Sequence, residues 1–328
     1  MQTAALSLGV TSLAPIGKIR RIASLAEHSG VYGMWIGEDI GRGSDVFVQA
    51  SAAMLTAPTT NVGIGVTSPM VRNISTIARA AAALAEIDPD RFRLGLGVGG
   101  LQDLARLGLT VEKPFMMMKD AVHALRRIWA GETLTLQGEN FDLRQFLVRY
   151  QSGFNVPLYL GVRGPKLLRL AGQIADGVIL SGPMAYLKKA LEIVRTGAIG
   201  RGTRSRPRIV VWLPTLVVRK RKDQDLARAV AATVIADTPA KVLEMAEISE
   251  TAVESVRRTA RERGYPAASS YVTEELLNSF TISGNAGHVS QVLQSLAELG
   301  ADEVVFGPPF GTPLTRSIRE VVSAWQTL

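Results

Sequence analysis

The chain has 328 residues, of which 47% are hydrophobic and 20% charged, with a formal net charge of +8 and no cysteine. This length and apolar content suffice to bury a large core, and no apolar run reaches the length of a membrane span. The lack of cysteine excludes disulfides, thiolate nucleophiles and cysteine-ligated metals. No basic segment precedes the first apolar stretch, so we expect a cytoplasmic protein without a signal peptide.

Short apolar runs rich in β-branched residues alternate with amphipathic helical patterns. The predicted strands are 4–10, 32–36, 61–67, 91–98, 156–161, 177–181, 208–218 and 303–307. The predicted helices are 16–29, 46–57, 76–87, 165–174, 184–194, 226–236 and 286–299. Gly30 and Gly300 each follow a predicted helix, where glycine adopts the left-handed conformation that ends it. This repeat predicts an α/β fold, a (β/α)8 TIM barrel.

An open, doubly wound sheet is the alternative, but no Gly-x-Gly-x-x-Gly motif opens a helix after the first strand. Two stretches fall outside the repeat. Residues 102–151 contain a helical pattern at 116–129 and a polar–apolar alternation at 133–141 that is typical of a β-hairpin. Residues 238–280 are rich in helical patterns. We predict that both are insertions in βα loops of one domain spanning 1–328.

Basic residues cluster at 201–208 and 219–222, but neither cluster is interleaved with aromatic residues. No helix-turn-helix or zinc-finger pattern is present either. Solvated loop charge therefore explains these clusters better than nucleic-acid binding. His28, His123 and His288 have no partner at zinc-ligand spacing, so we assign no metal site.

The segment 156–180 is the most informative one for function. An apolar run ends at Gly161, the turn Val162–Gly164 follows, and Pro165 begins a helix, where a missing N–H costs nothing. Glycines let backbone N–H groups approach a ligand, and the N-terminus of a helix favours negative charge. The guanidinium of Arg163 adds a positive charge with several hydrogen-bond donors. The turn is a candidate phosphate cradle, with an ordinary strand-to-helix connection as the alternative.

Four stretches together carry a family resemblance: Asn61-Val-Gly-Ile-Gly-Val-Thr-Ser-Pro-Met-Val-Arg-Asn73, Arg93-Leu-Gly-Leu-Gly-Val-Gly99, Gly161-Val-Arg-Gly-Pro-Lys166 and Gly300-Ala-Asp-Glu-Val-Val-Phe-Gly-Pro-Pro309. With them the chain resembles the bacterial-luciferase-like superfamily, and within it most closely the coenzyme F420-dependent methylenetetrahydromethanopterin reductases. The resemblance implies a barrel that binds a flavin or a deazaflavin at the C-terminal ends of its strands, and a dimer or tetramer.

The resemblance also implies where the cofactor lies. A non-proline cis peptide in the third strand would back the ring system, and the matching bond joins Gly65 and Val66. Thr67 and Ser68 fall where relatives contact the pyrimidine end of the ring, where a hydroxyl can hydrogen-bond a ring carbonyl. A plain barrel strand with a bend, followed by a capped turn before Pro69, is the structural alternative.

The phosphate of the cofactor would lie, by the same resemblance, on the backbone N–H groups of Val162, Arg163 and Gly164. Ser181 and Gly182, at the end of the next strand, would line the same pocket.

The chain departs from the reductases at their carboxylates. The glutamate at the end of their first strand is replaced by Thr11, and the aspartate after their fourth strand is absent in register, although Asp103 follows a few residues later. Glu38 and Asp39, at the end of the second strand, are the best candidates for an acid near the ring. Alternatively, both cap the loop and helix that follow.

Three functions remain open from the sequence. The first is a coenzyme F420-dependent oxidoreductase that transfers a hydride to or from a small or pterin-like substrate. The second is an FMN-dependent monooxygenase of the same superfamily. The third is a cofactor-binding paralogue without turnover, which the missing carboxylates suggest.

Overall fold

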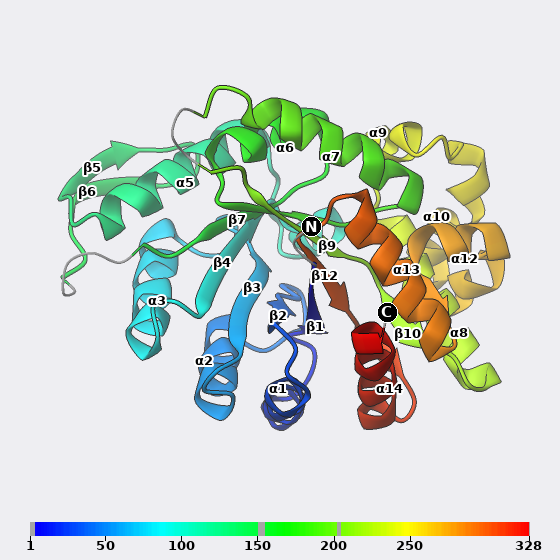
Figure 1. Cartoon of the computed structure of the whole chain (residues 1–328). Helices are drawn as coiled ribbons and strands as arrows, with labels where there is room; N and C mark the ends of the chain where they lie inside the picture. Colours follow the sequence, from blue (N-terminus) through cyan, green and yellow to red (C-terminus); the bar gives the residue numbers. More distant parts are fainter. Residues whose placement is uncertain (1–3, 150–154, 202–204, 328) are drawn as a thin grey trace.

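The computed structural model describes residues 4–149, 155–201 and 205–327, and a closed barrel of parallel strands forms its centre (Figure 1). The barrel strands are β1 (Ala5–Thr11), β2 (Gly33–Gly37), β3 (Asn61–Thr67), β4 (Phe92–Gly97), β7 (Leu158–Gly161), β8 (Gly177–Leu180), β9 (Arg208–Trp212) and β12 (Glu303–Phe306). They follow the order β1-β12-β9-β8-β7-β4-β3-β2. The predicted α/β class and (β/α)8 TIM barrel are confirmed.

Helices surround the barrel (Figure 1). They are α1 (Ile16–Ser29), α2 (Val46–Thr56), α3 (Ile74–Ile87), α6 (Pro165–Ile174), α7 (Met184–Ala198), α8 (Arg221–Ala236), α13 (Ala286–Leu299) and α14 (Leu314–Thr327). The side chain of Asp45 caps α2 by accepting from two backbone N–H groups, and Asn73 caps α3. Gly30 and Gly300 end α1 and α13 with φ of 65° and 115°, so the predicted left-handed caps are confirmed.

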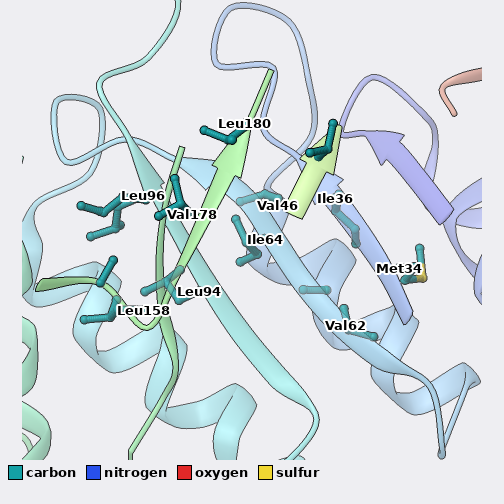
Figure 2. Close-up of a cluster of buried hydrophobic side chains, with 14 of the residues drawn as sticks. Met34, Ile36, Val46, Val62, Ile64, Leu94, Leu96, Leu158, Val178 and Leu180 are labelled. Carbon is teal, nitrogen blue, oxygen red and sulfur yellow. The ribbon is translucent and has the colours of Figure 1, made fainter. Parts of the chain in front are cut away.

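The barrel strands alternate between an apolar outer face and a mixed inner face. Outward side chains are buried against the helices, and Figure 2 labels several of them: Met34, Ile36, Val62, Ile64, Leu94, Leu96, Leu158, Val178 and Leu180. The inner face carries a separate cluster that includes Trp35, Tyr159, Ile179, Val210 and Val305. Because side chains alternate between the two faces of each strand, the inward residues do not pack against the helices.

The predicted strand 208–218 is wrong as one element. It splits into β9 and β10 (Thr215–Val217), and β10 leaves the barrel to pair with β11 (Ile282–Gly284) and β13 (Pro309–Gly311) in a separate sheet. Pro214 lies at the break, where it has no N–H to donate to a neighbouring strand. β11, β13 and α14 (Leu314–Thr327) were not predicted from the sequence.

The stretch between β4 and β7 contains α4 (Leu101–Arg106), α5 (Pro114–Trp129) and the hairpin of β5 (Leu134–Gln137) and β6 (Asp142–Phe146). The hairpin is confirmed, but its second strand begins at Asp142 because the turn occupies 138–141, closed by the N–H of Gly138 donating to the carbonyl of Phe141. The predicted end of this insertion, at 151, lies outside the described residues.

The second insertion is helical and follows α8. It contains α9 (Ala240–Met245), α10 (Glu250–Arg263), α11 (Tyr265–Ala268), the 3₁₀ turn η1 (Ser269–Tyr271) and α12 (Glu274–Phe280). Together with α8 these elements bury a core of their own, which includes Ala231, Val253 and Phe280. They group on one side of the barrel (Figure 1). No helix in the described ranges is long and apolar enough to cross a membrane.

A buried charged network fills the N-terminal half of the barrel interior. Glu303, whose side chain is fully buried, accepts hydrogen bonds from Ser7 at 2.6 Å, Trp35 at 2.7 Å and Arg93 at 2.8 Å. The Arg93 guanidinium also lies 4.6 Å from the centre of the Trp35 ring. Side chains from β1, β2 and β4 therefore depend on one carboxylate, which β12 supplies.

Replacing Glu303 by Gln should destabilise the fold strongly. The substitution leaves Arg93 as a buried cation without its anion, and removing one partner of a buried pair costs about 3 kcal/mol or more. Glu244→Gln is the matched control, because Glu244 pairs with Lys241 on the surface and both side chains are largely exposed. Urea denaturation of both variants measures the difference, and equal losses would contradict a structural role for Glu303.

Candidate functional site

Glycines hold the C-terminal half of the barrel interior open. Strands β1, β2, β3, β4, β7 and β12 carry one within two residues of their C-terminal ends: Gly9, Gly37, Gly65, Gly97, Gly161 and Gly307. Large side chains of other residues pack directly against several of these glycines. A methyl group on Gly9 would lie 2.6 Å from the Trp212 ring, and one on Gly97 or Gly161 would lie 2.5 or 2.6 Å from the methyl groups of Val66.

Two cavities open at this end of the barrel, with volumes of about 430 and 610 Å³. Six residues line both of them: Gly37, Gly65, Val66, Gly161, Val162 and Arg163. The first cavity extends toward the loops after β3 and β4. The second extends toward Trp212, the C-terminal part of α8 and Tyr265 of the helical insertion, and its wall is mostly apolar. Adjoining cavities of this size suit a cofactor and a small ligand bound side by side.

Most of the predicted cofactor-binding residues meet at these cavities, although they come from β3, β7 and β8. Gly65, Val66, Gly161, Val162 and Arg163 line both cavities. Thr67, Ser68 and Gly164 line the first, and Ser181 lines the second. Gly182 lines neither cavity, because it packs against the ring of Tyr186.

The bulge in β3 borders both cavities. Its register against β4 shifts between Ile64 and Thr67, and the Gly65–Val66 peptide bond is cis, as the resemblance implied. Gly65 packs closely on Trp35 and Trp212, where an added methyl group would lie 3.0 Å from each ring. The bulge therefore rests on two tryptophans.

Glu38 lies in the wall of the first cavity as one member of a charged network. Its Oε1 accepts hydrogen bonds from Nε and Nη2 of Arg72 at 3.1 and 2.5 Å, and its Oε2 accepts one from Thr67 at 2.6 Å. Arg72 also pairs with Asp45 at 2.9 Å. Burial opposes the charge of Arg72, but the hydrogen bonds and charges of these carboxylates raise its pKa above the usual value. This arrangement suits an ionised, acceptor-only carboxylate better than a proton donor.

Asp39 lines the second cavity and also structures the loop after β2. Its Oδ1 accepts a hydrogen bond from the backbone N–H of Arg42 at 2.9 Å, and its own N–H donates to Ser12 Oγ at 2.9 Å. Asp39 therefore combines both interpretations from the sequence, a loop cap and an acid that faces a cavity.

The hydroxyl protons of Thr67 and Ser68 are both used inside the protein. Thr67 donates to Glu38, and Ser68 Oγ donates to the carbonyl of Val98 at 2.7 Å. Ser68 Oγ also accepts from the N–H of Met70 at 3.1 Å. A hydroxyl has a single proton, so neither side chain has a proton left for a ring carbonyl in this arrangement.

The turn after β7 leads into α6 with no side chain capping the helix N-terminus. The first N–H groups of a helix have no partner inside the helix, so α6 presents uncapped donors beside the cavities. A methyl group on Gly164 would meet nothing within 4 Å, so this corner has open space. These features fit the predicted phosphate cradle.

Arg163 binds the end of α8. Its Nη1 donates to the carbonyl of Asp237 at 3.2 Å and lies 3.9 Å from the carboxylate of the same residue. The Tyr186 hydroxyl donates to the carbonyl of Arg163 at 2.8 Å, and burial raises the pKa of this phenol, which keeps it protonated. An anion in the cradle would therefore share Arg163 with Asp237.

Several residues of the site were not identified from the sequence. Trp212 walls the second cavity and is held by a 2.6 Å hydrogen bond from Nε1 to the carbonyl of Gly307. Tyr265 lines the same cavity, and its hydroxyl donates to Gln102 at 2.8 Å. The sequence could have identified Trp212. Side chains alternate between the two faces of a strand, so Trp212 lies on the same inward face as Arg208 and Val210.

Among the described residues, the carboxylates near the cavities form no metal site. Asp103, the late aspartate after β4, lines the first cavity together with Asp237, and it pairs with Arg106 at 2.8 Å. In the parts of the chain that the structure describes, no group of three or more His, Cys, Asp or Glu residues is placed to hold a metal.

A sequence profile described as luciferase-like monooxygenase matches residues 2–303. The chain belongs to this family. It is 32% identical over 303 residues to the 5,10-methylenetetrahydromethanopterin reductase of Archaeoglobus fulgidus, covering 90% of each chain. It is 26% identical to the F420-dependent glucose-6-phosphate dehydrogenase of Kineococcus radiotolerans, covering 89% of this chain and 87% of the relative.

Solved structures of luciferase-like proteins share the fold. The coenzyme F420-dependent tetrahydromethanopterin reductase of Methanopyrus kandleri aligns over 99% of both chains, with a TM-score of 0.87 and 21% identity. An F420-dependent secondary alcohol dehydrogenase, solved with an F420-acetone adduct, aligns over 98% of this chain and 99% of its own, with a TM-score of 0.79 and 18% identity. The luciferase-like barrel therefore extends over nearly the whole chain.

The contact between Gly97 and Val66 provides a test of the open barrel end. Gly97→Ala should lower the free energy of unfolding by about 1–3 kcal/mol, because the new methyl group overlaps the Val66 side chain. Adding Val66→Ala should recover much of this loss. Gly164→Ala is the control, since its methyl group meets no neighbour. Thermal or urea unfolding measures all four proteins, and no recovery in the double variant would contradict the packing described.

Proposed function

We propose that this chain is a coenzyme F420-dependent oxidoreductase that transfers a hydride to or from a small or pterin-like substrate. One observation carries the proposal: two adjoining cavities meet at the Gly65–Val66 bulge beside the uncapped N-terminus of α6. The relatives from Archaeoglobus fulgidus and Kineococcus radiotolerans support it, since one is a methylenetetrahydromethanopterin reductase and the other is F420-dependent by name.

The residues present fit a deazaflavin with an anionic tail. The first cavity offers the glycine-lined bulge for a flat ring system and polar groups at Glu38 and Thr67. The open space at Gly164 and the uncapped donors of α6 suit a phosphate. When bound, the deazaflavin supplies the hydride in a two-electron step. We assign the bulge to holding the ring and 161–164 to holding the phosphate, with Ser181 on the side of the second cavity.

The second cavity is our proposed substrate chamber. Trp212 forms one wall, and apolar side chains such as Leu213 and Val234 exclude water, which strengthens electrostatic interactions at the reacting carbon. Thr11 stands where the reductases carry a glutamate, and Asp39 is the acidic side chain in this wall. We therefore propose Asp39, and not the Arg72-bound Glu38, as the acidic group that lies beside the substrate.

An FMN-dependent monooxygenase is the second candidate. The family profile carries the monooxygenase description, and a solved monooxygenase, RslO1 from Streptomyces bottropensis, aligns over 98% of this chain with a TM-score of 0.70 and 16% identity. A flavin and a deazaflavin share the tricyclic shape that the bulge would support, so cavity shape alone favours neither.

The remaining features stay predictions from the sequence: one domain over 1–328 with insertions at about 102–151 and 238–280, a cytoplasmic homodimer or homotetramer, and no nucleic-acid or membrane partner. Paired arginines in the basic clusters support the absence of nucleic acid. Arg206 binds Asp302 at 2.6 Å, and Arg219 binds Glu320. Part of the first cluster, 202–204, lies outside the described residues.

Ligand titration followed by reduction tests the proposed function. The purified protein should bind coenzyme F420 more tightly than FMN, measured by quenching of ligand fluorescence. Bound F420 should lose its visible absorption when a hydride donor for the reverse reaction is added. Preferential FMN binding with oxygen consumption would support the monooxygenase instead. Tight F420 binding without bleaching by a panel of donors would support a paralogue without turnover.

Charge substitutions around Arg163 test the phosphate cradle. Arg163→Glu should weaken F420 binding by about tenfold or more, because it places an anion beside the phosphate. Asp237→Asn should strengthen binding, because it removes a carboxylate that competes for Arg163. Arg169→Glu makes the same charge change at an exposed position within α6 and serves as the control. Equal affinities of the Arg163→Glu and Arg169→Glu proteins would show that the cradle is misassigned.

A further inference from the structure

The lining of the second cavity differs between two of its sides. The C-terminal part of α8 contributes Val230, Thr233 and Val234. The hydroxyl of Thr233 is used within the helix, where it donates to a backbone carbonyl at 3.1 Å, so this side offers a ligand mainly apolar surface. The loop after β2 instead contributes two charged residues, Asp39 and Arg42. A ligand in this cavity therefore meets an apolar side and a charged side.

The loop that carries Arg42 is fixed against the end of β1. The backbone N–H of Asp39 donates to Ser12 Oγ, and the N–H of Ser44 donates to the Ser12 carbonyl, both at 2.9 Å. Within the loop, the N–H of Arg42 donates to Oδ1 of Asp39, and the N–H of Gly43 donates to the Asp39 carbonyl, again at 2.9 Å. The backbone of Arg42 is therefore held in place before a ligand binds, which reduces the cost of ordering it.

The guanidinium of Arg42 is left without a protein partner. Arg42 is exposed, and among the described residues its hydrogen bonding is confined to its backbone N–H. Arg163, the other arginine in this lining, is held by the carbonyl of Asp237. A guanidinium keeps its positive charge and carries five N–H donors. Arg42 is therefore the cation in this lining whose charge and donors are still available to a ligand.

We infer that Arg42 binds a carboxylate of the substrate, and that the second cavity takes molecules with an apolar body and one anionic end. The inference rests on the proposed function and deepens it, since it names the chemical class of the substrate. A guanidinium matches a carboxylate with two parallel hydrogen bonds. The Asp39 carboxylate disfavours an anion on its own side, and it repels a dianionic phosphate more strongly than a carboxylate. The anionic end is therefore a carboxylate at the guanidinium.

Calorimetric titration with two matched probes tests this subsite. The probes are 4-phenylbutanoate and its neutral amide, 4-phenylbutanamide, each titrated into the protein loaded with coenzyme F420. Both have an apolar body that suits the α8 side, and only the first has a carboxylate. The wild-type protein should bind the carboxylate about tenfold more tightly than the amide, because a charge-assisted pair of hydrogen bonds is gained. In Arg42→Gln this preference should disappear.

Two further variants separate charge recognition from a general effect of the substitution. Arg42→Lys should keep part of the preference, because it keeps the positive charge and loses the paired donors. Arg79→Gln is the matched control and should keep the full preference. It removes the same charge from an exposed residue of α3 that lines neither cavity. Circular dichroism and thermal unfolding check that each variant is folded.

The outcomes separate this inference from the proposed function. Equal affinities of the two probes for the wild-type protein, no binding of the carboxylate, or the same preference in Arg42→Gln would each overturn the inference. Loss of the preference in Arg163→Gln but not in Arg42→Gln would place the carboxylate on the turn after β7 and would also overturn it. Failure of the wild-type protein to bind coenzyme F420 is a separate result, which would overturn the proposed function before any probe is added.

Discussion

The inner face of the barrel is filled at one end and kept open at the other, and the site depends on this difference. At the N-terminal end, Trp35, Arg93 and Glu303 fill the interior with a buried, hydrogen-bonded network. At the C-terminal end, glycines such as Gly97 and Gly161 leave room that Val66 partly occupies. The cavities therefore lie where the inward positions are glycines, which have no side chain.

Most of the charged side chains around this opening are held by ion pairs and hydrogen bonds within the protein. Glu38 is held by Arg72, and Arg163 by the end of α8 at Asp237. These pairs fix side-chain directions before any ligand binds, which reduces the cost of ordering them on binding. They also set the polarity of the wall, since Glu38 accepts the proton of the Thr67 hydroxyl. The network that stabilises the loops thus also limits the hydrogen-bond donors left in this wall.

Local patterns predicted the barrel well, because alternation, helix caps such as Gly30 and the Pro165 helix start are written in neighbouring residues. The candidate cradle could be predicted for the same reason, since Gly161–Gly164 is one contiguous turn. Partners distant in sequence were missed. Arg72 reaches Glu38 across 34 positions and Arg163 reaches Asp237 across 74, and no local pattern reports such contacts.

Those distant partners changed the interpretation of two predicted residues. Glu38 suited an acid when considered alone, but its hydrogen bonds to Arg72 and Thr67 favour a positioning role. Thr67 suited a donor to a ring carbonyl, but its proton is already used. Pro214 is a local indication of the break after β9. The β-branched residues on both sides of it nevertheless favoured the prediction of one continuous strand.

A crystal structure of the protein with coenzyme F420 tests the central claim most directly. We expect the ring system to lie on the Gly65–Val66 bulge and the phosphate on the turn 161–164. A ligand bound outside the barrel mouth, or a ring whose phosphate lies away from that turn, would contradict the account.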